Sequence, residues 1–110
     1  MWGKIMVVIS NDEKVIELIN VITVEPEHQQ HIVDNVQEIL KKFAKKRSGF
    51  VSARVLKSLD GTRVVYFIRW RSLDDGKAWI ESINEILKVA KSRVKNADYN
   101  LYEAVEAIEL

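Results

Sequence analysis

Three residues stand out for the chemistry they could do: Asn20, Tyr66 and Trp70, each in a largely apolar, strand-like segment. A buried amide needs a hydrogen-bond partner, whether it serves the fold or a ligand. A tyrosine hydroxyl can protonate a developing oxyanion, and an indole can donate its N–H or stack on a ring. The alternative for each is a role in the core alone. As a site they would form a small polar and aromatic pocket, and we expect the substrate-contacting side chains to be Ile22, Phe43, Ile68, Trp79 and Ile83.

Other candidates for chemistry are weaker. His28 and His31 share one helix face, but the sequence offers them no further convergent ligand, so we expect surface residues and no metal site. Asp74 and Asp75 are adjacent and point in different directions, which favours a helix start over an acid–base pair. The chain has no cysteine, which excludes disulfides, thiolate catalysis and zinc–cysteine sites.

Length and charge narrow the possible partners. A chain of 110 residues has room for one domain, which we take to be residues 1–110. The net charge of +1, with both signs spread along the chain, argues against nucleic acid or an anionic membrane as the main partner. The apolar run Ile5–Ile9 is too short for a signal peptide or a membrane span. We expect a cytoplasmic protein.

Hydrophobic periodicity predicts the elements that would position these residues. An extension over residues 1–14 could add an edge strand. The next elements are a strand over 15–24 and a helix over 26–47 that begins at Pro26. They are followed by two strands, over 50–57 and 63–71, which are joined at Asp60-Gly61. Ser72 and Asp75 form a capping pattern at a second helix, and a last strand runs over about 99–108. The order βαββαβ predicts an α+β, ferredoxin-like antiparallel sheet with both helices on one face.

The alternation of side chains divides the sheet into two faces. A tight turn at Asp60-Gly61 would pair Val55 with Tyr66, Ala53 with Ile68 and Val51 with Trp70, giving an apolar face under the helices that also carries Asn20. The opposite face mixes apolar and charged residues, which predicts a homodimer through this face, with Glu17 paired to an arginine. Its apolar members are Ile19, Val21, Phe50, Leu56, Val65 and Phe67, and its arginines are Arg54, Arg69 and Arg71.

Several blocks of the chain, from about residue 15 to the end, resemble the antibiotic biosynthesis monooxygenase domain family. They are Leu18-Ile19-Asn20-Val21-Ile22-Thr23-Val24-Glu25-Pro26-Glu27, Ser48-Gly49-Phe50-Val51-Ser52-Ala53, Ser58-Leu59-Asp60-Gly61-Thr62-Arg63-Val64-Val65, Trp70-Arg71-Ser72 and Leu101-Tyr102-Glu103-Ala104-Val105. The resemblance implies a dimeric α/β barrel with a pocket between sheet and helices. It also implies one of two activities found in the family. Some members resemble cofactor-free oxygenases that convert polyketide anthrones to quinones, and others are haem-degrading enzymes.

The resemblance carries over to particular residues. The family's first-strand asparagine falls on Asn20, and its third-strand tryptophan falls on Trp70. The quinone-forming oxygenases have a second asparagine where this chain has Tyr66, which is a departure from their pattern. The haem degraders carry an iron-binding histidine in the second helix, and this helix has none.

Two hypotheses follow. In the first, the protein is a monooxygenase that needs no cofactor and acts on a small aromatic or polyketide-like substrate, with Asn20, Tyr66 and Trp70 as catalytic residues. In the second, it is a non-catalytic dimeric binding module that holds a small aromatic or apolar ligand in the same pocket. A polar group able to remove a proton from the substrate would favour the first hypothesis over the second. Neither Asn20 nor Tyr66 is a good base at neutral pH.

Overall fold

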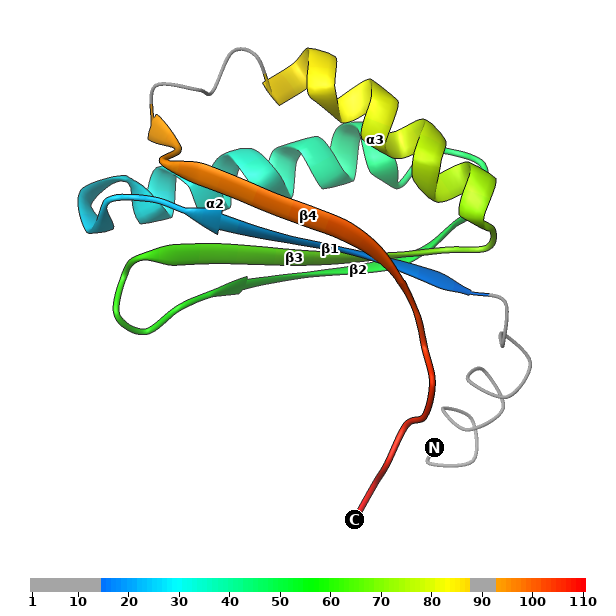
Figure 1. The fold of residues 1–110 in the computed structure, drawn as a ribbon. Helices are drawn as coiled ribbons and strands as arrows, with labels where there is room; N and C mark the ends of the chain where they lie inside the picture. The colour runs from blue at the N-terminus through cyan, green and yellow to red at the C-terminus, as the bar shows by residue number, and fades with distance from the viewer. Residues whose placement is uncertain (1–14, 88–92) are drawn as a thin grey trace.

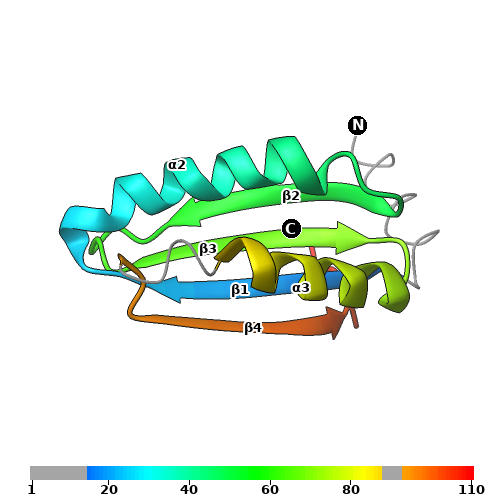
Figure 2. The same cartoon turned by 90° about the horizontal axis from the view of Figure 1, so that it is seen from above.

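Two helices cover one face of a four-stranded antiparallel sheet (Figures 1 and 2). The computed structural model describes residues 15–87 and 93–110. The strands are β1 (Ile16–Thr23), β2 (Phe50–Lys57), β3 (Arg63–Trp70) and β4 (Asn96–Glu103), in the order β2-β3-β1-β4. The helices are α2 (Gln29–Ile39) and α3 (Leu73–Leu87). This arrangement confirms the predicted ferredoxin-like α+β fold. The predicted N-terminal extension lies outside the described residues.

The first strand of the chain lies inside the sheet, between β3 and β4. Its even-numbered residues Leu18, Asn20 and Ile22 are buried under the helices, whereas the odd-numbered residues between them are only half-buried. The strand therefore divides its side chains between two faces as predicted. Within the described part of the chain, no helix is both long and apolar enough to cross a membrane.

The β2–β3 hairpin follows the predicted register over most of its length. Ala53 pairs with Ile68 and Val55 with Tyr66, but the partner of Trp70 is Phe50, not Val51. The register shifts between Phe50 and Ser52, and such an extra residue forms a β-bulge that reverses the alternation of faces. Phe50 consequently packs against the core on the helix-covered side, and its predicted place on the opposite face is wrong.

The hairpin loop explains why the register was predictable. Ser58 N donates to Arg63 O at 3.0 Å, and Gly61 N donates to Ser58 O at 3.2 Å. Gly61 has a φ of 82°, a left-handed conformation that favours glycine. The Asp60 carboxylate accepts hydrogen bonds from Thr62 N and from the Ser58 and Thr62 hydroxyls, which lowers its pKa to about 2. The loop is therefore longer than Asp60-Gly61 alone but keeps the same pairing.

The first helical region, predicted as one helix over 26–47, consists of three segments. A 3₁₀ turn, Pro26–His28, leads into α2, and α2 continues into a π-helical turn, Leu40–Ala44, where Lys45 N donates to Leu40 O at 2.9 Å. A π turn takes more residues per revolution than an α turn, so it rotates the later side chains away from the α-helical stripe. Leu40 and Ala44 stay buried, whereas Phe43 is 49% exposed.

The second helix begins with the predicted cap. Ser72 Oγ accepts a hydrogen bond from Asp75 N at 3.1 Å and donates its hydroxyl to Asp75 Oδ2 at 2.8 Å. Gly49, with a φ of 86°, lies so close that a Cβ at this position would collide with the Asp75 carboxylate. Arg71 N donates to Gly49 O at 2.8 Å. These contacts fix the start of α3 beside the end of β3, close to Trp70.

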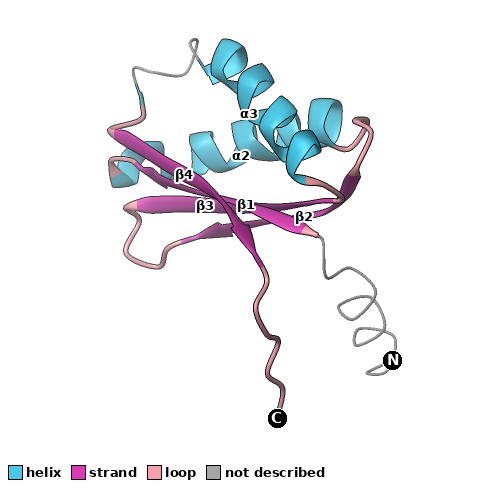
Figure 3. Ribbon diagram, turned by 45° about the vertical axis from the view of Figure 1, so that its right-hand side comes forward, coloured by secondary structure: helices cyan, strands magenta, loops and turns pink. Residues whose placement is uncertain are grey.

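The last strand begins and ends earlier than predicted. It covers Asn96–Glu103 instead of about 99–108, and it pairs with β1 along its whole length. Asn96, Ala97 and Asp98 have weak intrinsic strand preference, so pairing with the neighbouring strand decides their conformation. Residues 104–110 continue as an extended segment outside the sheet, on the side opposite the helices (Figures 1 and 3). We refer to Ala104–Leu110 as the C-terminal segment.

Candidate functional site

Asn20 and Tyr66 lie side by side on the helix-covered face because β1 and β3 pair directly at these two residues. Asn20 is 0% exposed and Tyr66 is 3% exposed. Asn20 Nδ2 donates a hydrogen bond to the Tyr66 hydroxyl at 3.1 Å. Since the hydroxyl accepts from Asn20, its own hydrogen remains free to be donated, and no described residue accepts it.

The Tyr66 hydroxyl is held in its neutral form. Burial raises the pKa of Tyr66 because the phenolate would lose its hydration, and the nearby Tyr99 adds to this effect. The hydrogen bond from Asn20 and the polar hydrogen of Trp79 act in the opposite direction but are weaker. The Trp79 indole lies near the hydroxyl without completing a hydrogen bond to it. At neutral pH Tyr66 is therefore a proton donor and not a base.

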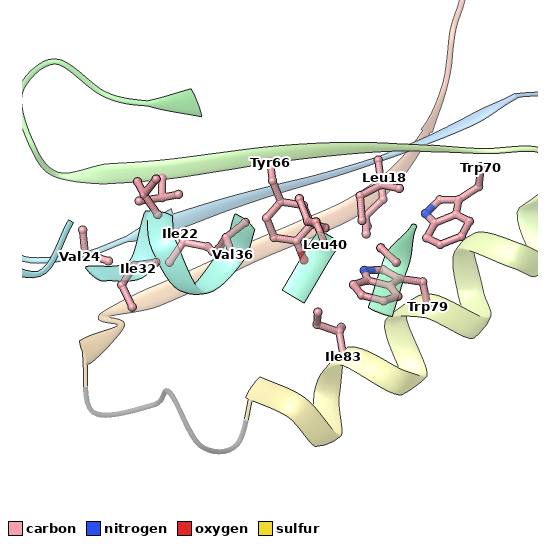
Figure 4. Packing of buried hydrophobic residues seen from close by; sticks show 14 residues of the cluster. Leu18, Ile22, Val24, Ile32, Val36, Leu40, Tyr66, Trp70, Trp79 and Ile83 are labelled. Carbon is pink, nitrogen blue, oxygen red and sulfur yellow. The ribbon is translucent and has the colours of Figure 1, made fainter. Parts of the chain in front are cut away.

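Two tryptophans continue this cluster toward the start of α3. Trp70 on β3 and Trp79 on α3 are both 0% exposed, and their ring centroids are 5.9 Å apart (Figure 4). Phe50 meets Trp70 edge-on at 6.0 Å, which is the consequence of the bulge in β2. The Arg47 guanidinium lies 5.9 Å from the Trp79 ring centroid, a cation–π contact at the end of the first helical region.

This cluster contains more polar atoms than its own hydrogen bonds use. Among the described residues, the Asn20 Oδ1 atom and the indole nitrogens of Trp70 and Trp79 are buried without a hydrogen-bond partner. Buried polar atoms are nearly always paired, because an unpaired one costs roughly 1–3 kcal/mol. One acceptor and two donors of the cluster therefore keep unused hydrogen-bonding capacity.

The apolar residues expected to contact a substrate fall into two groups. Ile22, Ile68, Trp79 and Ile83 are all buried in the same core as Tyr66 and Trp70. Figure 4 shows Trp79 and Ile83 pointing from α3 toward Tyr66, which points from the sheet toward the helices. Phe43 does not join them, since the π turn leaves it half-exposed on the surface of the first helical region.

Sequence reasoning missed two neighbours of the cluster. Tyr99 pairs with Asn20 across β1 and β4, so Tyr66, Asn20 and Tyr99 form a row across three adjacent strands. Tyr99 is 37% exposed and thus connects the buried pair to the surface. The sequence signal for Tyr99 is the alternation of side chains along β4, combined with the register of β4 against β1. The second neighbour is Arg47, whose guanidinium packs on the Trp79 ring.

The two histidines stand apart from this cluster. His31 is exposed and contacts the Arg93 side chain. Residues 15–87 and 93–110 contain no group of three or more histidine, aspartate or glutamate side chains arranged to hold a metal ion. The functional groups of the candidate site are thus an amide, a phenol and two indoles.

Comparison with known proteins shows which family and which structures the chain is similar to. The family model described as antibiotic biosynthesis monooxygenase matches residues 15–93. A tetracenomycin-F1 monooxygenase from Streptomyces glaucescens is 36% identical over 73 residues. That match covers 66% of this chain and 65% of the relative, somewhat less than two thirds of its length.

Solved structures share the fold at low sequence identity. A monooxygenase from the gene ActVA-Orf6 of Streptomyces coelicolor, in complex with nanaomycin D, superposes with a TM-score of 0.76 at 21% identity, covering 91% of this chain and 96% of that one. SnoaB, a cofactor-independent oxygenase from Streptomyces nogalater, gives a TM-score of 0.65 at 16% identity, covering 86% and 97%. These similarities show a common fold.

Proposed function

This chain belongs to the antibiotic biosynthesis monooxygenase family, and from that premise we propose that it oxidises a small aromatic substrate with molecular oxygen, without metal or flavin, beside Asn20. The observation that carries the proposal is the buried, uncharged set of polar atoms around Asn20, Tyr66 and Trp70 that lack partners among the described residues. The nanaomycin D bound to the ActVA-Orf6 protein and the cofactor independence of SnoaB support the substrate class and the absence of a cofactor.

The reaction needs an electron-rich substrate and little else. In an anthrone-like molecule, a CH₂ group beside aromatic rings loses a proton and becomes an enolate, which gives electrons to O₂ and forms a carbon–oxygen bond. Protonation of the resulting peroxide, loss of the second C–H proton and cleavage of the O–O bond leave a carbonyl and release water. One O₂ is consumed, one oxygen atom enters the product, and the substrate supplies all the electrons.

The side chains would contribute orientation and charge stabilisation. Asn20 Nδ2 has a second hydrogen beyond the one given to Tyr66, which it can donate to the enolate oxygen. Trp70 Nε1 lies four residues further along β3 from Tyr66 and can donate to another oxygen of the substrate. Tyr66, neutral because its pKa is raised by burial, can protonate the peroxide. Neither Asn20 nor Tyr66 accepts the first proton, so we expect a substrate acidic enough to lose it to water.

Oxygen consumption with a panel of anthrones and hydroquinones tests this proposal. Asn20→Ala and Trp70→Phe should each lower turnover about tenfold to a thousandfold, the usual effect of losing a hydrogen bond made in the transition state. Asn84→Ala, an exposed asparagine on α3, is the matched control and should leave turnover unchanged. Equal effects of Asn20→Ala and Asn84→Ala would contradict the assigned role of Asn20.

A binding function is the second candidate, and one observation favours it. The cluster lacks a base at neutral pH, as Tyr66 holds its proton more firmly than a tyrosine in water. A protein that only holds an apolar aromatic ligand would need no base. Saturable ligand binding, measured by quenching of tryptophan fluorescence, without oxygen consumption above background would favour this second function.

The assembly we propose is a homodimer through the face of the sheet that the helices leave open, which we call the outer face. Its apolar side chains are half-buried or exposed, and Leu56 reaches 41% exposure. An uncovered apolar patch of this kind favours association. The residues are Ile19, Val21, Leu56, Val65 and Phe67, with Glu17, Arg54 and Arg69 among them.

A further inference from the structure

A groove separates the first helical region from β2, which is an edge strand of the sheet. Figure 2 shows α2 and the turn that follows it running alongside this strand. The groove has a volume of about 340 Å³, which is large enough for a small aromatic molecule. Its apolar lining residues are partly or wholly buried, and its lysines are exposed. The apolar residues are Leu40, Phe50, Ala53 and Val55, and the polar ones are Gln37, Lys41 and Lys45.

The π turn brings the two lysines to the same side of the helical region as Leu40. In a regular α-helix, side chains five residues apart point to different sides. Here Lys45 N donates to Leu40 O at 2.9 Å, so that five residues close the turn. Lys45 therefore joins Lys41 and Leu40 at the groove. Such π turns within helices are frequently found at functional sites.

The charges at the groove have one sign. No acidic residue is among the described side chains that line it. Within the described part of the chain, neither Lys41 nor Lys45 forms an ion pair, whereas Glu38 on the same helix is paired to Lys42 at 2.6 Å. Two ammonium groups about one turn apart can each donate to one oxygen of a carboxylate. The groove is therefore complementary to an aromatic or apolar molecule with an anionic end.

The apolar floor of the groove is also a wall of the candidate site. Phe50 meets Trp70 edge-on, with the ring centroids 6.0 Å apart, and Val55 pairs with Tyr66 across β2 and β3. Leu40 belongs to the same core as Tyr66 (Figure 4). A ring bound in the groove would thus lie on side chains that neighbour the two aromatic residues of the site.

We propose that this groove is the mouth of the candidate site, and that it selects aromatic substrates carrying a carboxylate, which Lys41 and Lys45 bind. The carboxylate stays at the exposed lysines, so only the uncharged ring system meets the helix-covered face. The inference rests on the oxygenase proposed above and adds the chemical class of its substrate.

Two probes of the same shape test the proposal. Anthracene-2-carboxylate and anthracene-2-carboxamide share one ring system and differ in charge, and fluorescence anisotropy measures the affinity of each. The wild type should bind the carboxylate about tenfold more tightly, and added salt should reduce this preference because the lysines are exposed. Lys41→Gln with Lys45→Gln should abolish the preference and leave the affinity for the carboxamide unchanged. Equal affinities of the wild type for the two probes would overturn the proposal.

The matched control removes two positive charges elsewhere. Lys46→Gln with Lys77→Gln changes two exposed lysines that do not line the groove, and it lowers the net charge by the same amount. This variant should keep the preference for the carboxylate. A loss as large as that caused by Lys41→Gln with Lys45→Gln would show that net charge alone attracts the probe, which would contradict the proposed site.

A third variant tests the apolar floor without changing charge. Val55→Phe places a larger side chain in the groove and suits a strand equally well. It should weaken the binding of both probes by a similar factor. Leu73→Phe, at an exposed position on α3, is the control and should leave both affinities unchanged. Circular dichroism checks that the variants fold, and unchanged binding by a folded Val55→Phe variant would contradict the proposal.

Oxygen uptake separates this inference from the function on which it rests. With an anthrone that carries a ring carboxylate, Lys41→Gln with Lys45→Gln should raise KM about tenfold and leave kcat unchanged, because the lysines bind the substrate away from the reacting atoms. Uptake with an unchanged KM would contradict the groove but not the oxygenase. A preference for the carboxylate probe without any oxygen uptake would contradict the oxygenase and support the groove as a binding site for aromatic acids.

Discussion

The two faces of the sheet alternate along the same strands, yet they differ in how much of each side chain they bury. On the helix-covered face Leu18 and Ile68 are 1% and 0% exposed. The adjacent residues Ile19 and Phe67 remain half-buried on the outer face, opposite each other across β1 and β3. The same backbone thus positions a closed surface, which holds the domain together, and an open one, which is available to another chain.

The two faces also differ in the kind of polar side chain that they carry. Those under the helices are an amide and a phenol, Asn20 and Tyr66, whereas the outer face carries the acidic and basic residues Glu17, Arg54 and Arg69. Burying an ion without a partner costs far more than burying an amide or a phenol. The comparison indicates that the covered face is suited to uncharged ligands, and that the outer face needs a partner with complementary charges.

The largest effect we expect comes from a charge on the outer face. Phe67→Glu would remove a large apolar side chain from the proposed dimer contact and put a carboxylate beside Arg54 and Arg69 in its place. Losing a buried phenylalanine ring costs about 3–5 kcal/mol, which corresponds to a dissociation constant raised on the order of a hundredfold or more. Light scattering at micromolar concentration should then give a monomer mass. Phe43→Glu, an exposed phenylalanine on the helical side, is the control. A dimer that survives Phe67→Glu with unchanged stability would show that the faces have other roles.

A pair of adjacent substitutions on β1 should show the difference in burial directly. Leu18→Ala removes a fully buried side chain and should lower the free energy of unfolding by about 2–5 kcal/mol, independently of protein concentration. Ile19→Ala should cost roughly 1 kcal/mol in the monomer, because its side chain is only partly removed from water. Urea unfolding at several protein concentrations measures both, and equal losses would contradict the comparison.

The smallest effect concerns the titration of Tyr66. Burial raises the pKa of Tyr66 above the value near 10 of an unfolded tyrosine, so the folded state keeps a proton that the unfolded state loses. This contribution to stability is complete below about pH 10 and is lost as the pH rises through the folded pKa. Tyr66→Phe should reduce the fall in unfolding free energy between about pH 9 and 11, measured with urea. An unchanged fall in the Tyr66→Phe variant would contradict this assignment.

Most of the fold followed from local patterns whose physical causes act within a few residues. The Asp60-Gly61 turn set the hairpin register, Pro26 started the first helical region, and Ser72 with Asp75 capped the second helix. The neighbourhood of Asn20 and Tyr66 followed from the topology of the ferredoxin-like sheet. Family membership, expected from the sequence blocks, is confirmed by the match over residues 15–93.

Two side chains were predicted on the wrong side of the molecule, each at a place where an extra residue interrupts the regular repeat of a strand or helix. The bulge at Val51 moved Phe50 to the other face, and the π turn over Leu40–Ala44 rotated Phe43 out of the core. Both preserve the overall hydrophobic pattern while changing its phase, so a count of apolar positions does not detect them. The bounds of β4 depended on pairing with β1, which is a long-range effect.

The central position of β1 has a consequence for synthesis on the ribosome. Both neighbours of β1 come later in the chain: Asn20 meets Tyr66, 46 residues further on, and Tyr99 only when β4 has been made. A nascent chain therefore leaves β1 without one or both of its neighbouring strands until nearly all of the sheet has been translated. Contacts of such sequence separation also slow refolding. A truncated product that stops before β4 would leave one edge of β1 open, and we expect such fragments to associate with one another or to be bound by chaperones.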